Sequence, residues 1–283
     1  MIEAPEALIL AMQLNETVRG KTINYVIAAQ TPHKFTWYHD SPESYPDKLT
    51  GKIVENCTAF GGMVEINISS DTTLLFCDGA NLRYYSPGEK LPSKHQLLIG
   101  FSDESCLVVS VRMYGGLFCF TGNKLEGNFS NYYLAARTKP QVMSETFDLS
   151  YFLKLINEDR AQNKTAKAFL ATEQTIPGLG NGVLQDILYI ARIHPKTKIK
   201  ELGEDQKKYL FFSLKKYYRI FIYPMEEIVK PTYSDKRENI YPFSQKIQQE
   251  YPAKIAESTS AKKIIWEEVF TIVRNVSPYP IKK

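Results

Sequence analysis

The sequence lacks any apolar run long enough to cross a membrane, which takes about 18–20 residues. Its early apolar stretch, 8–12, is far shorter and follows Glu3 and Glu6 rather than basic residues. This pattern predicts the buried face of an N-terminal helix and not a secretory signal. We therefore expect a cytoplasmic protein that does not bind membranes.

Metal ligands are also scarce. The four cysteines form no CxxC pair, and no cysteine follows Cys119. Three of them lie in apolar, strand-like runs, which favours buried thiols over the alternatives of zinc ligands or disulfides. The four histidines are scattered, and no phosphate loop or nucleophile triad is present. We expect no metal and no cofactor.

Basic residues are few in the first half of the chain and concentrated in the second. Residues 1–150 hold 12 Lys and Arg against 16 Asp and Glu, whereas residues 151–283 hold 23 against 15. Residues 192–219 alone hold nine basic and three acidic residues. A basic concentration of this kind favours a polyanionic partner. A solvated helix face is the alternative.

The periodicity of the chain changes near its middle. A helix is predicted over 5–18, and period-two alternation between about 22 and 122 predicts a β-sandwich. Helices are predicted in the second half, so the fold class is α+β. The clearest expected strands are 63–68, 73–77, 81–85, 96–101, 106–111 and 117–120, and the later helices are 149–157, 164–172, 182–192 and 205–223. The polar segment 123–143 is the expected domain boundary.

One turn carries the strongest functional signal. Gly178 and Gly180 precede Asn181, which is expected to cap the next helix. Backbone N–H groups at a helix start and the helix dipole suit a phosphate. An ordinary interhelical turn is the alternative.

The flanking residues favour the phosphate site. From Lys164 to Pro195 the chain resembles the helix–two-turn–helix segment of the formamidopyrimidine-DNA glycosylase and endonuclease VIII family. The match includes Lys167, the turn at 177–181 and the tail at 191–195. The opening, Met1 to Ala7, resembles an altered form of that family's start.

The resemblance implies a chemistry. The family attacks the sugar of a damaged nucleotide with an N-terminal proline and forms a Schiff base, while the next glutamate moves protons. Here position 2 is Ile. The expected nucleophile is therefore the α-amine of Met1, or of Ile2 after processing, with Glu3 as acid and base and Glu6 retained beside it.

The resemblance also implies contacts to a flipped-out nucleotide and its phosphates. The matching positions are Lys167, Asn181, Gly178, Gly180, Lys263, Lys94, Arg112 and Tyr114. Tyr114 could instead be a core aromatic of the sandwich. Two family positions differ here. Gly61 or Gly62 stands in place of a phosphate-binding lysine, and Asp78 in place of a methionine that enters the duplex.

Three domains are expected from these features. Residues 1–135 form the leading helix and β-sandwich, 136–235 the helix–two-turn–helix domain, and 236–283 a metal-free, finger-like hairpin. The expected protein is a monomer that binds damaged or abasic double-stranded DNA in base excision repair, in the nucleoid if it is bacterial. The resemblance implies removal of oxidised bases and cleavage at abasic sites. The alternatives are an inactive binder of distorted duplex and a binder of structured RNA.

Overall fold

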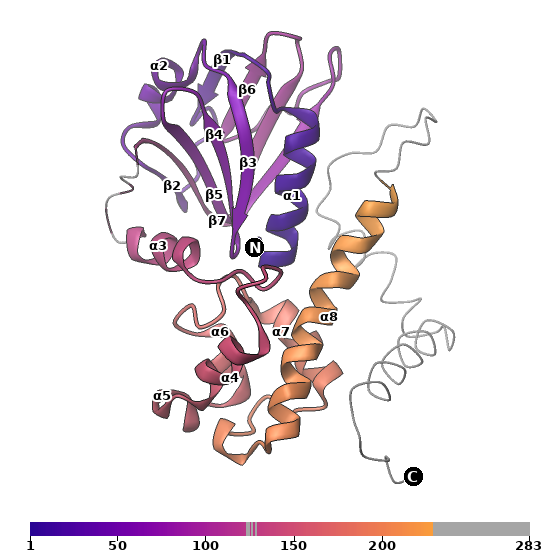
Figure 1. The fold of residues 1–283 in the computed structure, drawn as a ribbon. Helices are drawn as coiled ribbons and strands as arrows, with labels where there is room; N and C mark the ends of the chain where they lie inside the picture. The colour runs from indigo at the N-terminus through magenta and orange to yellow at the C-terminus, as the bar shows by residue number, and fades with distance from the viewer. Residues whose placement is uncertain (123–124, 126, 128, 229–283) are drawn as a thin grey trace. The chain divides into compact units, whose positions relative to one another are not determined.

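The computed structural model describes residues 1–122, 125, 127 and 129–228, drawn in colour in Figure 1. These residues form an α+β fold, with a helix and a β-sandwich followed by further helices, as the sequence predicts. The hairpin expected over 236–283, with Lys263, lies outside them. The three-domain division remains a prediction.

Helix α1, Ala4–Thr17, opens the chain. Pro5 suits its first turn, where no N–H is needed for the helix ladder. Glu3 and Glu6 form a capping box, in which the Glu6 carboxylate accepts the backbone N–H of Glu3 at 3.1 Å. Its buried face packs against the strands β3, Val54–Phe60, and β4, Met63–Ile68.

The strands belong to a single hydrogen-bonded sheet in the order β1-β6-β7-β5-β4-β3, with the short β2, Thr36–Tyr38, parallel to β7. Strand β1 spans Ile23–Ala28 and β6 spans Leu97–Phe101. The two long strands are β5, Thr72–Tyr85, and β7, Cys106–Thr121. Each was expected as two shorter strands, because a bend in the middle interrupts its apolar pattern.

That bend turns one sheet into a sandwich. Residues 72–78 of β5 pair with 115–121 of β7, and residues 80–85 pair with 106–111, with a shift in register between Asp78 and Ala80. The two halves of the sheet share one apolar core, which also takes in the buried face of α1. The glycine pair Gly115–Gly116 lies at the bend of β7, where an added Cβ would contact the Ala80 nitrogen or the Cys77 sulfur.

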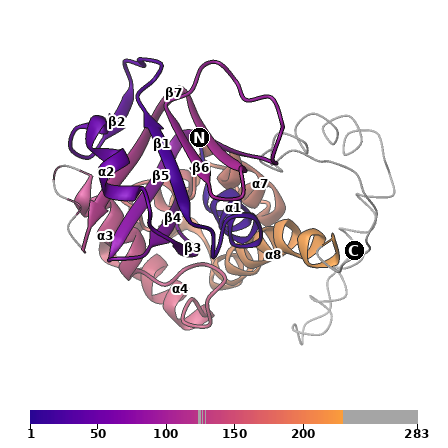
Figure 2. The ribbon, with the colours of Figure 1, turned by 90° about the horizontal axis from the view of Figure 1, so that it is seen from above.

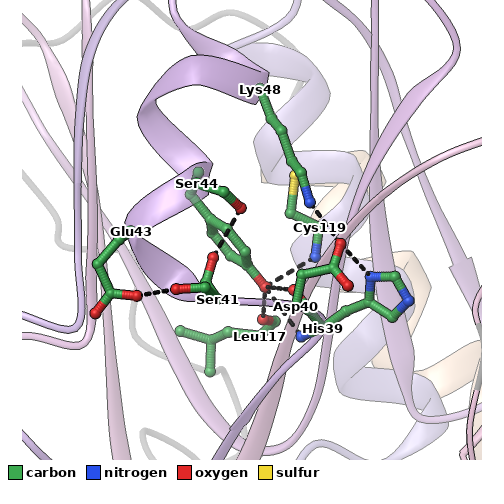
Figure 3. Close-up of polar contacts among 9 residues, drawn as sticks. His39, Asp40, Ser41, Glu43, Ser44, Lys48, Leu117 and Cys119 are labelled. Carbon is green, nitrogen blue, oxygen red and sulfur yellow. Dashed lines mark hydrogen bonds and ion pairs between the residues drawn. The ribbon is translucent and has the colours of Figure 1, made fainter.

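A short connection after β2 is anchored by one buried tyrosine. The 3₁₀ turn Pro42–Ser44 leads into α2, Tyr45–Leu49, which lies beside β1 (Figure 2). The Tyr45 hydroxyl accepts the N–H groups of His39 and Cys119 and donates to the Leu117 carbonyl at 2.8 Å (Figure 3). The ion pair between Lys48 and Asp40, 2.7 Å apart, closes this corner at its exposed side.

The segment expected as a polar crossing contains a helix, α3, Ser130–Thr138. Its buried Tyr133 donates to the Glu65 carboxylate of β4 at 2.5 Å, and the Arg137 guanidinium lies 3.9 Å from the same carboxylate. Glu65 is 1% exposed, so this pairing compensates a buried charge. As a result α3 is fastened to the sheet.

The remaining helices form a second apolar core. They are α4, Leu149–Asn157; α5, Asp159–Gln162; α6, Ala166–Ala171; α7, Asn181–Ala191; the 3₁₀ turn Ile199–Glu201; and α8, Glu204–Ile228. Asp148 and Thr165 cap α4 and α6 through their side chains. Figure 1 shows the start of α1 at the side of the sheet nearest these helices.

The four cysteines are free and buried, as expected. In the part of the chain that the structure describes, no helix has the length and apolar character to span a bilayer. No group of three or more His, Cys, Asp or Glu side chains suited to a metal ion occurs there either.

We predict that Tyr45→Phe lowers the free energy of unfolding by about 1–3 kcal/mol, because it leaves buried backbone groups without a partner. Urea unfolding followed by circular dichroism measures the change. Tyr189→Phe is the matched control, since Tyr189 is 80% exposed and its hydroxyl is in water. It should change stability by less than about 0.5 kcal/mol. Equal effects of the two substitutions would contradict an anchoring role for Tyr45.

Candidate functional site

The start of helix α7 holds a carboxylate of the protein itself. Glu3 Oε1 accepts the N–H of Gly182 at 3.0 Å, and Glu3 Oε2 accepts that of Val183 at 2.8 Å. Burial raises the pKa of Glu3, and these two hydrogen bonds act in the opposite direction. The helix N-terminus is an anion site, as the sequence predicts, but these two N–H groups bind Glu3 rather than a phosphate.

The turn before α7 differs in detail from the expectation. Gly180, not Asn181, is the capping residue, and Asn181 is the first residue of the helix. Gly178 has a φ of +75°, whereas Gly180 has an ordinary φ of −97°. Gly180 is needed for a different reason, since an added Cβ would lie 2.3 Å from Glu3 Oε1. The exposed Asn181 side chain therefore remains available to a ligand.

Backbone hydrogen bonds hold the first residues on both sides. The N–H of Ile2 donates to the Asp78 carbonyl in β5 at 2.5 Å, and the N–H of Ala4 donates to the Gly178 carbonyl at 2.9 Å. Ile2 is 8% exposed and packs in the core of the sandwich, while Met1 is 59% exposed. The chain start is thus fixed between the sheet and the turn, with Met1 outside the core.

A pocket of about 280 Å³ opens around this chain start. Three acidic residues, Glu3, Asp78 and Glu173, line it together with Met1 and with Tyr132 of α3. Burial raises the pKa of the Asp78 carboxyl group, while the Cys77 thiol and the Met1 ammonium act to lower it. Burial also raises the pKa of Tyr132 to about 12. The remaining lining residues are Ile2, Gly62, Cys77, Ala171, Gln174, Ile176, Gly178, Leu179, Gly180 and Asn181.

The structure therefore brings together only some of the predicted site residues. Met1, Ile2 and Glu3 share the pocket with the turn at 178–181, whereas Glu6 does not line it and acts as the capping partner of Glu3. Lys167 is exposed on α6 and lines a second hollow of about 560 Å³, beside Leu184, Tyr189 and His194 of the α7 region.

Arg112 and Tyr114 are exposed on β7, and Lys94 is exposed in the loop before β6. Tyr114 is 38% exposed, so it is not a core aromatic of the sandwich. Its hydroxyl donates to Met1 Sδ at 3.4 Å, and its ring centroid lies 6.0 Å from that of the exposed Trp37. Tyr114 therefore lies beside the mouth of the pocket.

The glycines at 61 and 62 have a structural explanation. They form the turn between β3 and β4, which packs backbone to backbone against the turn before α7. A Cβ on Gly62 would lie 2.7 Å from the Ile2 carbonyl oxygen, and one on Gly178 would lie 2.1 Å from the Gly62 nitrogen. A side chain at position 62 would therefore displace the Ile2 backbone, and one at position 61, where φ is +55°, would lie 3.0 Å from the Gly178 nitrogen.

Tyr132 was not identified from the sequence. It lies on α3, in the segment expected to be a crossing without helix, and it reaches the pocket because Tyr133 and Ala136 of the same helix are buried. The spacing of these two apolar residues, three apart, is the helical signal that could have revealed it. Asp78 was noted in the sequence only as a departure from a family position.

The pocket's composition suits nucleophilic chemistry. An α-amine can attack a carbonyl carbon once it has lost its proton, and neighbouring carboxyl groups can take up and return that proton. The Cys77 thiol, by contrast, has a pKa held well above its usual value by burial, so it is a poor nucleophile.

Comparison with known proteins gives a consistent set of relatives. The chain is 24% identical to the formamidopyrimidine-DNA glycosylase of Lactococcus lactis over 216 residues, which cover 76% of this chain and 75% of the relative. It is 27% identical over 228 residues to the enzyme of the same name from Lactobacillus delbrueckii, covering 76% and 75%. No protein-family model matches the sequence.

Solved structures share the fold. The structure of Lactococcus lactis Fpg with DNA containing an abasic site superposes with a TM-score of 0.65 and 22% identity, covering 78% of this chain and 79% of that one. The wild-type Lactococcus lactis Fpg with DNA containing an oxidised pyrimidine gives a TM-score of 0.65 and 23% identity, covering 78% and 80%.

We predict that Gly178→Ala lowers the free energy of unfolding by at least about 2 kcal/mol, because it combines an unfavourable φ with overlap against the Gly62 backbone. Gly88→Ala is the matched control. Gly88 has a φ of +79° and nothing within 4 Å of an added Cβ. Gly88→Ala therefore measures only the destabilisation from placing alanine at a positive φ, about 1–2 kcal/mol. Chemical unfolding of both variants measures the difference, and equal losses would mean that the two turns are not packed together.

Proposed function

Since the chain belongs to the family of the formamidopyrimidine-DNA glycosylases, we propose that it binds damaged double-stranded DNA in base excision repair. We further propose that the α-amine of Met1 forms an imine with the sugar of an abasic or damaged nucleotide. The observation that carries this proposal is the pocket at the chain start, where Met1 lies with Glu3 and Asp78.

The position of residue 2 supports Met1 as the nucleophile. The Ile2 side chain is buried, and its nitrogen donates to the Asp78 carbonyl, so that nitrogen is committed to the fold. Met1 is exposed at the pocket instead. The α-amine of Met1 is a primary amine, and such an amine attacks in its unprotonated form. A primary amine of this kind can form a Schiff base with the aldehyde of an abasic sugar.

The residues proposed to hold the DNA lie outside the pocket. Lys167 and Asn181 are exposed on the neighbouring helices α6 and α7, and Arg112 and Lys94 are exposed on the sandwich. The solved structures include one with abasic DNA and one with DNA containing an oxidised pyrimidine, and damaged duplex of this kind is the partner that we propose here. The proposed place of action is the cytoplasm, on the nucleoid if the protein is bacterial.

Two observations favour a second candidate, a binder without catalysis. Positions 61 and 62 are closely packed glycines and supply no cation, and Asp78 adds a negative charge near the proposed DNA. Such a protein would recognise an abasic or distorted duplex and form no covalent intermediate.

Borohydride trapping separates the two candidates. We predict that the protein, incubated with a duplex containing one abasic site and then reduced, gives a covalent adduct whose peptide map places the link on the α-amine of Met1. Intact mass of the unreacted protein identifies the first residue. A duplex without the abasic site is the control. Binding of the abasic duplex with no adduct at any pH would establish the non-catalytic candidate.

We also predict that Lys167→Ala weakens binding to every duplex sequence and lowers the slope of log K against log salt by about 1, because one phosphate contact is lost. Asn181→Ala should weaken binding with little change of slope, since the amide is neutral. Fluorescence anisotropy against salt measures both. Lys154→Ala, an exposed lysine of α4, is the charge-matched control. Unchanged binding in the Lys167 and Asn181 variants would show that neither residue contacts DNA.

A competition assay tests the RNA alternative. Stronger competition by structured RNA than by duplex DNA would favour an RNA partner.

A further inference from the structure

Asp78 occupies an unusual point of the sheet. It lies where the pairing of β5 with β7 shifts, and its φ is +57°, a left-handed conformation that few residues other than glycine adopt. The next residue, Gly79, has no room for a side chain, since a Cβ would lie 2.5 Å from the Tyr114 carbonyl oxygen. Backbone held in such a conformation is concentrated at functional sites.

This conformation places Asp78 against the chain start. Its carbonyl accepts the Ile2 N–H at 2.5 Å, and residue 78 lines the same pocket as Met1. Among the described residues, no Lys, Arg or His side chain forms an ion pair with Asp78. The α-ammonium of Met1 is the positive charge that acts on this carboxylate.

Glu3, a second carboxylate of the pocket, is less free to exchange protons. Both oxygens of Glu3 accept backbone N–H groups of α7, from Gly182 and from Val183. Protonating Glu3 would weaken these bonds at a helix start, where a negative charge is favoured. The Asp78 carboxylate has one weak side-chain partner, the Cys77 thiol at 3.5 Å. It can gain and lose a proton without disturbing a helix.

We propose that Asp78 is the proton-transfer partner of the Met1 α-amine, an inference that rests on the imine chemistry proposed above. The Asp78 carboxylate takes one proton from the Met1 ammonium, and the free amine attacks C1′ of the abasic aldehyde to form a carbinolamine. A C–N bond forms, and the C=O bond becomes a C–OH bond. The Asp78 carboxyl then gives its proton to that hydroxyl, which leaves as water, and a protonated imine remains.

The surroundings of Asp78 suit this exchange. Burial raises the pKa of its carboxyl group, which makes it a better proton acceptor than an exposed aspartate. The titratable groups around it are Cys77 on β5, the Met1 amine, Glu3, Tyr132 on α3, Tyr114 on β7 and Glu173 after α6. Glu173 is paired with Lys164 at 2.6 Å, and burial keeps Cys77 and Tyr132 protonated.

The test is the rate of borohydride trapping on an abasic duplex between pH 6 and pH 9, with full-length protein. In Asp78→Asn the rate should fall at least about tenfold near pH 6.5. The deficit should shrink to about twofold near pH 9, where hydroxide can remove the proton in place of the carboxylate. Asparagine tolerates a positive φ, so the fold should be kept. Asp78→Gly removes the carboxyl group at a residue that adopts this φ freely, and it should behave in the same way.

Two controls separate chemistry from binding and from charge. Binding to a duplex with a non-reactive abasic analogue should be unchanged or tighter in Asp78→Asn, because a negative charge is removed. Asp71→Asn, at an exposed residue before β5, should leave the trapping rate unchanged at every pH.

Three outcomes would overturn the inference. A faster rate in Asp78→Asn would show that Asp78 only repels DNA, and a deficit that is the same at every pH would show a structural role. In both cases the imine chemistry of the wild type would stand. No adduct from the wild-type protein would instead refute the imine chemistry itself, and the role of Asp78 with it.

Discussion

The site depends on a carboxylate bound at the start of a helix. Glu3 precedes α1 and yet satisfies two free N–H groups of α7, which lies about 180 residues later. The helix dipole favours the negative charge, and the two hydrogen bonds fix its direction. Through this contact the chain start is oriented toward the helical half, and Met1 reaches a pocket built from both halves.

Close backbone packing is the second constraint. Gly62, Gly178 and Gly180 each lie where a Cβ would overlap the chain start or the opposing turn. Residues 2–4 can therefore lie between the sheet and the turn with their backbone bonds to Asp78 and Gly178. A side chain at position 62 would overlap the Ile2 carbonyl oxygen in this arrangement.

The polar groups of the proposed site lie in two separate places. The pocket holds carboxylates around one amine, which suits proton exchange and imine formation, whereas the exposed Lys167 and Asn181 lie on the neighbouring helices. The proposed reaction and the proposed phosphate binding therefore fall on different groups. Asp78 lies inside the pocket, where its charge acts on the Met1 amine.

The sequence by itself determined the fold class, the helices around the turn at 177–181 and the family, because apolar periodicity and a dense local motif are properties of neighbouring residues. It also indicated Met1 and Glu3 as site residues. Only the tertiary structure decided that β5 and β7 are each one bent strand, that Glu3 fills the anion site of α7, that Glu6 is a cap and that Tyr114 is exposed. Tyr132 and Asp78 joined the site in the same way. These facts depend on contacts between residues far apart in the chain, and such contacts leave no local pattern in the sequence.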